Sequence, residues 1–166
     1  MIDQRRHRPA RPGRGRARGP DDGALDLALE TLFYGFRGVT AEADHLLAER
    51  GLSRVHHRIL FFVRRAPGLR PGALREVLRV SKQALARPLR ELVARGLVSA
   101  DVPPENRRTK ALRLTAAGAR LERRLSGSER ARFARAFRAA GPAGARGWHA
   151  VMRSLAADHA RSARPT

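Results

Sequence analysis

The chain has 166 residues, a length that suits one compact domain with an extension. Hydrophobic residues make up 42% of it, enough for a core, and the absence of cysteine excludes disulfides and cysteine-based metal sites. No apolar run is long enough to span a membrane, and no apolar stretch follows the charged N-terminus as in a secretory signal. We therefore expect a cytoplasmic protein without a membrane partner.

Positive charge is the strongest signal in the composition. The formal net charge is +20, and all but two of the 35 basic residues are arginines. Such a charge attracts polyanions, nucleic acid before anionic membranes, although a general bias toward arginine is the competing explanation. The placement of the charge favours a functional origin, because residues 64–110 carry ten arginines and two lysines against four acidic residues, a net of +8.

Residues 1–22 are rich in arginine, proline and glycine and contain almost nothing that could be buried. We interpret them as a disordered basic arm. The arm either adds non-specific phosphate contacts or is simply a solvated tail.

Apolar residues then recur at spacings of three and four from Leu25 to about Ala48, which predicts a helix. The stripe consists of Leu25, Leu29, Leu32, Phe36, Val39, Ala43 and Leu46. Gly51 ends this helix, and Ser53 is a candidate N-cap for a second helix at residues 54–65. The residues of the second helix expected to face the core are Val55, Ile59, Phe62 and Val63.

Two short helices follow, joined by a tight turn at Arg79-Val80. Pro71 suits the first position of one, and Ser81 suits the N-cap of the next, which covers about 82–95. This spacing is that of a helix-turn-helix, whose second helix enters the major groove of DNA. The candidate DNA contacts on that helix are Ser81, Lys82, Gln83, Arg87 and Arg90. Glutamine can bond adenine, lysine or arginine can bond guanine, and Arg90 suits a phosphate.

The periodicity then changes to that of short strands. Leu97 to Val102 and Lys110 to Leu114 flank a turn at residues 103–106, which predicts a β-hairpin. Arg107, Arg108 and Lys110 suit the negative potential of a DNA minor groove. In the alternative interpretation they are solvated surface charges.

The rest of the chain is predicted to be helical. Thr115 is a candidate N-cap for a helix that ends near Ser126 or continues to Ala139, and Gly141-Pro142 breaks it. A last helix, ending near residue 160, carries Trp148, Val151, Met152 and Leu155 at helical spacing. Because the small domain cannot cover the apolar stripes of both the first and the last helix, we expect them to pair across a two-fold axis. A monomer with both helices folded onto the core is the alternative.

Four landmarks follow one another through residues 81–118, within the part of the chain (51–120) where the match is most specific: S-K-Q, L-x-x-x-G-L-V, N-R-R and L-T-x-x-G. In this order and spacing they resemble the multiple antibiotic resistance regulator (MarR) family, with a match over about residues 25–160. The resemblance implies a mainly α fold: a winged helix-turn-helix with a two-stranded β-hairpin wing and with N- and C-terminal dimerisation helices. The implied divisions are a basic arm (1–22), an N-terminal dimerisation helix (23–52), the DNA-binding domain (53–115) and C-terminal dimerisation helices (116–162). The implied function is that of a homodimeric transcriptional regulator, usually a repressor, on a pseudo-palindromic DNA operator.

Two residues depart from the family pattern. Asn106 stands where the wing usually has an aspartate that orients an arginine, so the wing is expected to be looser and more positive. Pro88 lies inside the predicted recognition helix, where proline removes a backbone hydrogen bond, costs about 3 kcal/mol or bends the helix.

The resemblance also implies release by a small aromatic effector, and the lack of cysteine rules out a thiol-based oxidant switch. The candidate effector pocket lies where the first helix meets the second, with Tyr34, Phe36, His45, His56 and Arg58 as its lining. Packing is the competing role for Phe36. No metal is expected, because the adjacent His56 and His57 point about 100° apart on a helix. No nucleotide-binding or nucleophile motif is present, so we expect neither a cofactor nor an enzyme.

Two alternatives stay open. One is a non-specific, architectural nucleic-acid-binding protein that relies on charge alone. The other is a protein-interaction module that uses the winged helix without DNA, but it would need an apolar recognition face where this chain has Lys82, Gln83, Arg107 and Arg108.

Overall fold

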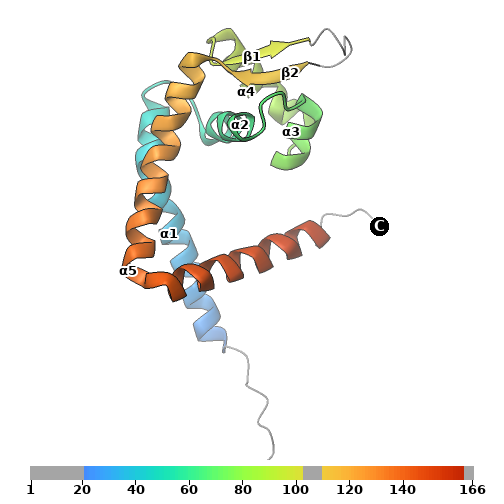
Figure 1. Cartoon of the computed structure of the whole chain (residues 1–166). Coiled ribbons are helices and arrows are strands. Elements are labelled where there is room, and N and C mark those ends of the chain that lie inside the picture. The colour runs from blue at the N-terminus through green and yellow to red at the C-terminus, as the bar shows by residue number, and fades with distance from the viewer. Residues whose placement is uncertain (1–20, 103–109, 163–166) are drawn as a thin grey trace, which may run out of the picture. The chain divides into compact units, whose positions relative to one another are not determined.

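The computed structural model describes residues 21–102 and 110–162. In chain order the elements are α1 (Asp22–Ala48), α2 (Arg54–Arg65), α3 (Pro71–Leu78), α4 (Lys82–Ala94), β1 (Val98–Asp101), β2 (Ala111–Leu114) and α5 (Ala116–Ser162), as Figure 1 shows. This order confirms the predicted mainly α fold with a two-stranded wing. The chain divides into two compact units within α1, between Gly35 and Phe36.

The start of α1 differs slightly from the prediction. The side chain of Asp21 accepts a hydrogen bond from the backbone N–H of Ala24 at 2.9 Å, so it caps the helix. Residues 21 and 22, predicted to be part of the arm, therefore belong to the helix start. The remainder of the predicted arm lies outside the described residues.

The core is built around α2, which contacts α3, α4, β2 and α5. Ile59, Leu60 and Val63 of α2 have no exposed surface. Neighbouring elements contribute the fully buried Leu74, Leu92, Leu112 and Leu125. Burying each side chain of this size contributes about 1.5–3 kcal/mol.

The predicted inner face of α2 was too narrow. Val55 and Phe62 are only partly buried, whereas Leu60 and two histidines are buried instead. A helix surrounded by several elements buries a wider arc than a helix that lies on a surface.

The turn between α3 and α4 lies at the predicted position. Arg79 ends α3 in the left-handed region with φ 51°, a conformation that L-residues other than glycine rarely adopt. Its N–H donates to the carbonyl of Glu76 at 3.2 Å. Ser81 then starts α4, and its Oγ accepts a hydrogen bond from the N–H of Ala84 at 3.1 Å. The helix-turn-helix is thus closed by local hydrogen bonds.

Pro88 does not end α4, which continues to Ala94. Proline at this position leaves the carbonyl of Ala84 without its helical donor, and because Ala84 is exposed, water can replace that donor. We expect Pro88→Ala to stabilise the protein by about 1–2 kcal/mol. Alanine restores the helical hydrogen bond, but it also gives the unfolded chain more conformational entropy, which offsets part of that stabilisation. Urea denaturation measures the free energy of unfolding of both this variant and Ala86→Gly, a control in the same helix. Ala86→Gly should lose about 1 kcal/mol of stability. A Pro88→Ala variant no more stable than the wild type would contradict this account.

The two strands form an antiparallel hairpin in which Val98 pairs with Leu114 and Asp101 with Ala111. The base of the hairpin is fixed to α5 by Thr115, whose Oγ1 donates to the carbonyl of Gly96 at 2.6 Å and accepts from the N–H of Gly118 at 3.1 Å. A Cβ on Gly118 would lie 1.9 Å from the carbonyl oxygen of Leu97. Only glycine therefore allows α5 to start this close to the strand.

The predicted break in the last helical segment is confirmed at Gly141. The helix from Ala116 does not end near Ser126 but continues to this glycine, whose φ is 70°. Aromatic contacts span the break: the ring centroid of Trp148 lies 5.3 Å from that of Phe133 and 5.5 Å from that of Phe137. Aromatic rings from the two sides of Gly141 are therefore in contact at the bend.

Candidate nucleic-acid interface

The N-terminus of α4 carries the first group of predicted DNA contacts. Lys82 and Gln83 are exposed in the first turn, directly after the Ser81 cap. Neither side chain makes a hydrogen bond or ion pair with any residue that the structure describes. A positively polarised helix end with a free lysine and a free glutamine can offer hydrogen-bond donors to both phosphates and base edges.

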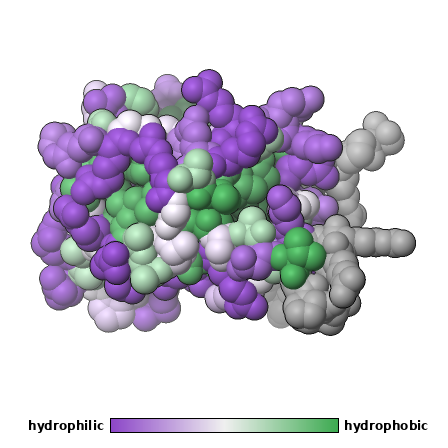
Figure 2. Space-filling view, turned by 90° about the horizontal axis from the view of Figure 1, so that it is seen from above, coloured by the Kyte–Doolittle hydropathy of each residue, from purple (hydrophilic) through white to green (hydrophobic). Residues whose placement is uncertain are grey.

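A groove lies between α3, α4 and the hairpin. Its volume is about 820 Å³. Apolar side chains line it, among them Leu85, Leu89, Val93, Ala100 and Leu112, together with the basic residues Arg75, Lys82, Arg90 and Lys110. The end of the molecule that carries the strands shows an apolar area surrounded by hydrophilic side chains (Figure 2). The groove thus combines predicted contacts from the helix and from the wing.

Arg87, the next predicted contact along α4, is held by a chain of hydrogen bonds that leads to α2. Its Nε donates to Glu91 Oε1 at 3.0 Å, and Glu91 Oε2 lies 2.9 Å from His56 Nε2. His56 Nδ1 accepts from the backbone N–H of Ser53 at 3.0 Å, so Nε2 carries the proton that bonds Glu91. The hydrogen bond from Arg87, and after it that from His56, lowers the pKa of Glu91.

The tip of the wing lies outside the described residues. The predictions for Asn106, Arg107 and Arg108 therefore stay predictions. Lys110, at the foot of β2, is described and exposed. Its place in the groove beside Lys82 and Arg90 agrees with a shared surface of helix and wing.

None of the five residues predicted for the effector pocket lines this groove. His45 is exposed and pairs at 3.2 Å with Glu49, which directly follows α1, whereas His56 is buried and bonds Glu91. The two histidines therefore have partners on different parts of the chain. Phe36 lies under the guanidinium of Arg54, 4.7 Å from its ring centroid, and Arg58 is exposed. Tyr34 is 62% exposed.

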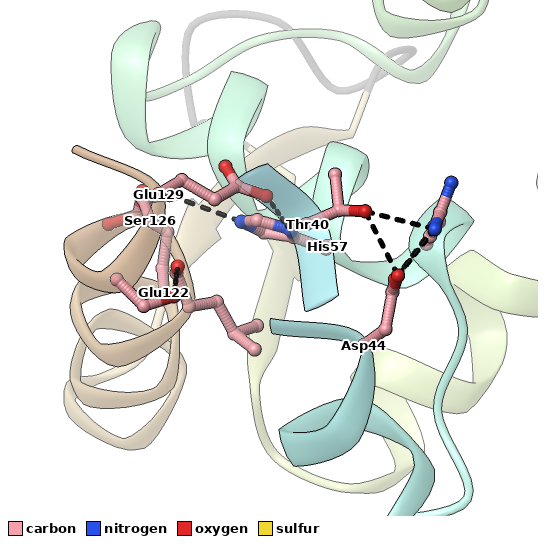
Figure 3. Close-up of polar contacts among 9 residues, drawn as sticks. Thr40, Asp44, His57, Glu122, Ser126 and Glu129 are labelled. Atoms are coloured by element: carbon pink, nitrogen blue, oxygen red, sulfur yellow. Dashed lines mark hydrogen bonds and ion pairs between the residues drawn. The ribbon is translucent and has the colours of Figure 1, made fainter. Parts of the chain in front are cut away.

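A partly buried polar cluster joins α1, α2 and α5 (Figure 3). Arg54 donates from Nε to Asp44 Oδ1 at 2.7 Å and from Nη2 to Thr40 Oγ1 at 3.0 Å, and it also pairs with the second carboxylate oxygen of Asp44. The hydrogen bond from Arg54 lowers the pKa of Asp44, despite the opposing effect of burial. This two-point contact anchors the second half of α1 to the start of α2.

The other half of the cluster connects α2 to α5. Glu122 is completely buried, and its Oε1 accepts a hydrogen bond from Ser126 Oγ at 2.6 Å. Arg64 Nε lies 2.8 Å from the other carboxylate oxygen, Oε2. The two form an ion pair, but the N–H of Arg64 does not point at the oxygen, so they form no hydrogen bond. His57 Nε2 lies 3.1 Å from Ser126 Oγ. Because the serine hydroxyl already donates to Glu122, it accepts from His57 Nε2–H. Burial lowers the pKa of His57, which favours this neutral form.

The tautomer of His57 has a consequence for Glu129. The unprotonated Nδ1 of His57 lies 3.6 Å from Glu129 Oε1, and burial, more than the nearby Asp44, raises the pKa of Glu129. A raised folded-state pKa means that the carboxylate of Glu129 costs stability, and this cost grows as the pH rises from the ordinary value of 4.5 through the folded pKa.

We therefore expect Glu129→Gln, which mimics the protonated acid, to melt about 3 °C higher than the wild type at pH 8, with a difference that shrinks toward pH 5. Thermal melts at both pH values measure it. Glu76→Gln, an exposed change of equal charge, should show no such dependence. A lower melting temperature of Glu129→Gln at both pH values would mean that Glu129 stabilises a charged His57.

Several of these residues escaped the sequence prediction, namely Asp44, Arg54, His57, Glu91, Glu122 and Glu129. One signal was present: His56 stands three residues after Ser53, where a capping box has a side chain that bonds back to the cap N–H. The other contacts join residues that are far apart in the sequence, and hydrophobic periodicity predicts only local structure. Within the described residues, no three histidines, cysteines or acids form a group that could hold a metal. Nor is any described helix both long and apolar enough to cross a membrane.

The fold and the helix-turn-helix recur in known proteins. Residues 50–109 match the MarR family. The HTH-type transcriptional regulator PetP of Rhodobacter capsulatus is 41% identical over 134 residues, which is 81% of this chain and 81% of that protein. A MarR family transcription regulator of known structure covers 87% of this chain and 95% of its own at a TM-score of 0.70 and 22% identity.

A second structural relative was solved with a ligand. The Mycobacterium tuberculosis MarR family protein Rv2887, in complex with salicylic acid, has a TM-score of 0.54 and 24% identity and covers 84% of this chain and 98% of its own. At these identities the solved structures establish the fold alone, whereas the curated relative establishes the family. This chain belongs to the MarR family of winged helix-turn-helix transcriptional regulators.

Proposed function

We propose that this regulator binds a pseudo-palindromic DNA operator as a homodimer and acts as a repressor. The observation that carries the proposal is the exposed first turn of α4, where Lys82 and Gln83 follow a capping serine and have no described partner. Arg87, Arg90 and Lys110 extend the same basic surface, and Arg107 and Arg108 are proposed to reach the minor groove from the wing. Such a protein works by binding and needs no catalytic group.

Exposed apolar side chains support the homodimer. On α1 they include Leu25, Leu29, Leu32, Phe33 and Phe36, and on the last part of α5 they include Trp148, Val151 and Leu155. Exposed apolar residues in such number mark an interaction surface, and a second copy of the chain is the occupant that a two-fold operator requires. The proposed dimerisation segments are those predicted from the sequence, residues 23–52 and 116–162. Light scattering of Leu29→Glu/Leu32→Glu should show a monomer where the wild type shows a dimer.

The test of operator binding uses the duplex that flanks the protein's own gene, at physiological salt and with excess competitor duplex. We expect the wild type to protect one site. Lys82→Ala/Gln83→Ala should bind that site about 100-fold more weakly, because each base contact contributes about 1–3 kcal/mol of discrimination. Arg123→Ala, an exposed arginine on α5, serves as the control and should bind like the wild type.

Two further variants separate specific from generic binding. Arg107→Ala/Arg108→Ala should weaken binding at the operator, whereas deletion of residues 1–22 should leave site selection intact. If competitor removes all binding and only the deletion matters, the protein is the non-specific architectural type that its +20 charge also allows.

We also propose that a small aromatic acid releases the protein from DNA. The support is the salicylic acid complex of the mycobacterial relative. Tyr34, Phe36, His45, His56 and Arg58 remain the residues proposed from the sequence for such a ligand, although their contacts lead to different elements. Titration of salicylate into the preformed operator complex, followed by fluorescence anisotropy, tests for release.

A further inference from the structure

Lysine is rare in this chain, and its two occurrences lie close to the same groove. Of the 35 basic residues, only Lys82 and Lys110 are lysines. Lys82 lies in the first turn of α4 and Lys110 lies at the foot of β2. Both are exposed, and both line the groove of about 820 Å³ between α3, α4 and the hairpin. The fold therefore places the only two side-chain amines of the chain beside one depression.

The groove is strongly basic. Arg75 of α3 and Arg90 of α4 line it together with the two lysines, and no acidic residue is among the described residues that line it. None of these four side chains forms an ion pair or hydrogen bond with another residue in the ranges 21–102 and 110–162. Four like charges around one depression raise the local potential, which concentrates small anions from solution. A compact dianion is therefore favoured in this groove.

Lysine and arginine differ in their chemistry more than in their charge. The guanidinium of arginine stays protonated and can hold a phosphate through two hydrogen bonds at once. The ammonium of lysine exchanges with a neutral amine, which is a nucleophile. In this groove arginines can bind a phosphate group while a lysine attacks the group that the phosphate carries. An acyl phosphate offers both parts, because its carbonyl carbon is bonded through oxygen to a phosphate that can leave.

The apolar floor of the groove suits the acyl part of such a molecule. Leu85 is 4% exposed and Leu112 has no exposed surface, so the groove reaches the edge of the core. Its volume lies in the range of small-molecule sites. A short acyl chain can lie against these leucines while its phosphate remains among the basic side chains.

We propose that Lys82 and Lys110 are modification sites, acylated at Nζ by a small acyl phosphate that binds in this groove. The neutral amine attacks the carbonyl carbon of the acyl phosphate. A C–N bond forms, the C–O bond to the phosphate breaks, and inorganic phosphate leaves. The nitrogen gives its proton to the departing phosphate, and no electrons are transferred to or from the protein. The product is an amide that has lost the positive charge of the lysine.

Acylation itself does not depend on DNA. As a control of operator binding, however, this inference rests on the proposed function. A neutral amide on Lys82 has lost the charge and two of the three N–H donors of the ammonium, so it cannot make the base or phosphate contact proposed for that residue. Acylated protein should therefore leave the operator.

The experiment treats the full chain with acetyl phosphate at constant ionic strength, without DNA, and measures the rate of acetylation at each lysine by peptide mass spectrometry. Both lysines should react at least about tenfold more slowly in Arg75→Gln/Arg90→Gln than in the wild type, because the groove then has no arginine to hold the phosphate. Arg123→Gln/Arg130→Gln, which removes two exposed arginines of α5 and the same net charge, should react like the wild type. Inorganic phosphate in place of chloride should slow the wild-type reaction.

Three results would overturn the assignment of these sites. They are no acetylation of either lysine in the wild type, equal rates in the wild type and both double variants, and no protection by inorganic phosphate. Circular dichroism of the variants checks that all of them are folded during the reaction.

Operator binding separates this inference from the proposed function. Treatment should weaken operator binding by the wild type at least about tenfold. The operator affinity of Lys82→Arg/Lys110→Arg should be the same before and after treatment, because this variant has no amine in the groove. A treated wild type of unchanged affinity would refute the control of DNA binding. If the lysines react as expected but the wild type selects no operator, the modification sites stand and the proposed function fails.

Discussion

Replacing Gly118 with alanine is expected to destabilise the protein by more than about 4 kcal/mol, enough to unfold most of it. The added Cβ would lie 1.9 Å from the carbonyl oxygen of Leu97 and 2.8 Å from its carbonyl carbon. That backbone cannot move freely, because the same carbonyl accepts the N–H of Thr115 at 3.2 Å and Leu97 leads directly into β1. Relief of the clash would pull the start of α5 off the hairpin.

Gly127→Ala is the matched control for this variant. It also lies within α5, and a Cβ there would meet no atom within 4 Å. Alanine should stabilise the helix at this position by about 1 kcal/mol. Denaturant unfolding of both variants, followed by circular dichroism, should therefore give shifts of opposite sign. A Gly118→Ala protein with the midpoint of the wild type would show that the helix and strand can separate at little cost.

Removal of the Arg64 guanidinium should have the second largest effect, a loss of about 3–5 kcal/mol in Arg64→Ala. Glu122 has no exposed surface, and Arg64 is the cation beside its Oε2, at 2.8 Å. Among the described residues, the carboxylate then keeps only the hydrogen bond from Ser126 at 2.6 Å. A buried carboxylate without a counter-charge is far more costly than the loss of a surface ion pair.

A second substitution checks this cause. If the loss comes from the uncompensated charge, Arg64→Ala/Glu122→Gln should recover much of the stability that Arg64→Ala loses. Arg58→Ala removes an exposed arginine from the same helix and should change stability by less than about 0.5 kcal/mol. The free energies of unfolding of the variants measure the coupling. A double variant less stable than Arg64→Ala would point to lost packing of the arginine stem rather than to charge.

The predicted elements came from local signals, and these were sufficient for the fold. Helix boundaries are set by a few adjacent residues. Ser81 caps the start of α4, Gly96 follows its end, and Gly141-Pro142 interrupts α5. The resemblance of four short motifs to the MarR family then identified this order of elements as a winged helix-turn-helix. Lys82 and Gln83 are exposed in the first turn of α4, and their contact with DNA stays a prediction.

The polar contacts were beyond such reasoning. His56 and Glu91 are 35 residues apart, and His57 and Ser126 are 69 apart, so only the packing of α2 against α4 and α5 brings them together. Packing also decides the partners of two residues predicted for the effector pocket, which stay a prediction. Adjacency of His45 and His56 at the helix junction was inferred from chain order, whereas their side chains turn to Glu49 and Glu91.

The bond between Arg87 and Glu91 bears on the entropy of DNA binding. A free arginine on a protein surface samples many rotamers, and fixing it on a phosphate costs about 0.5–1.5 kcal/mol. Arg87 Nε is already held by Glu91, which His56 holds in turn, while its two terminal nitrogens form no described hydrogen bond. Those nitrogens can meet a phosphate without release of the carboxylate. In the proposed complex, the pair with Glu91 therefore removes part of this entropy cost before the nucleic acid arrives.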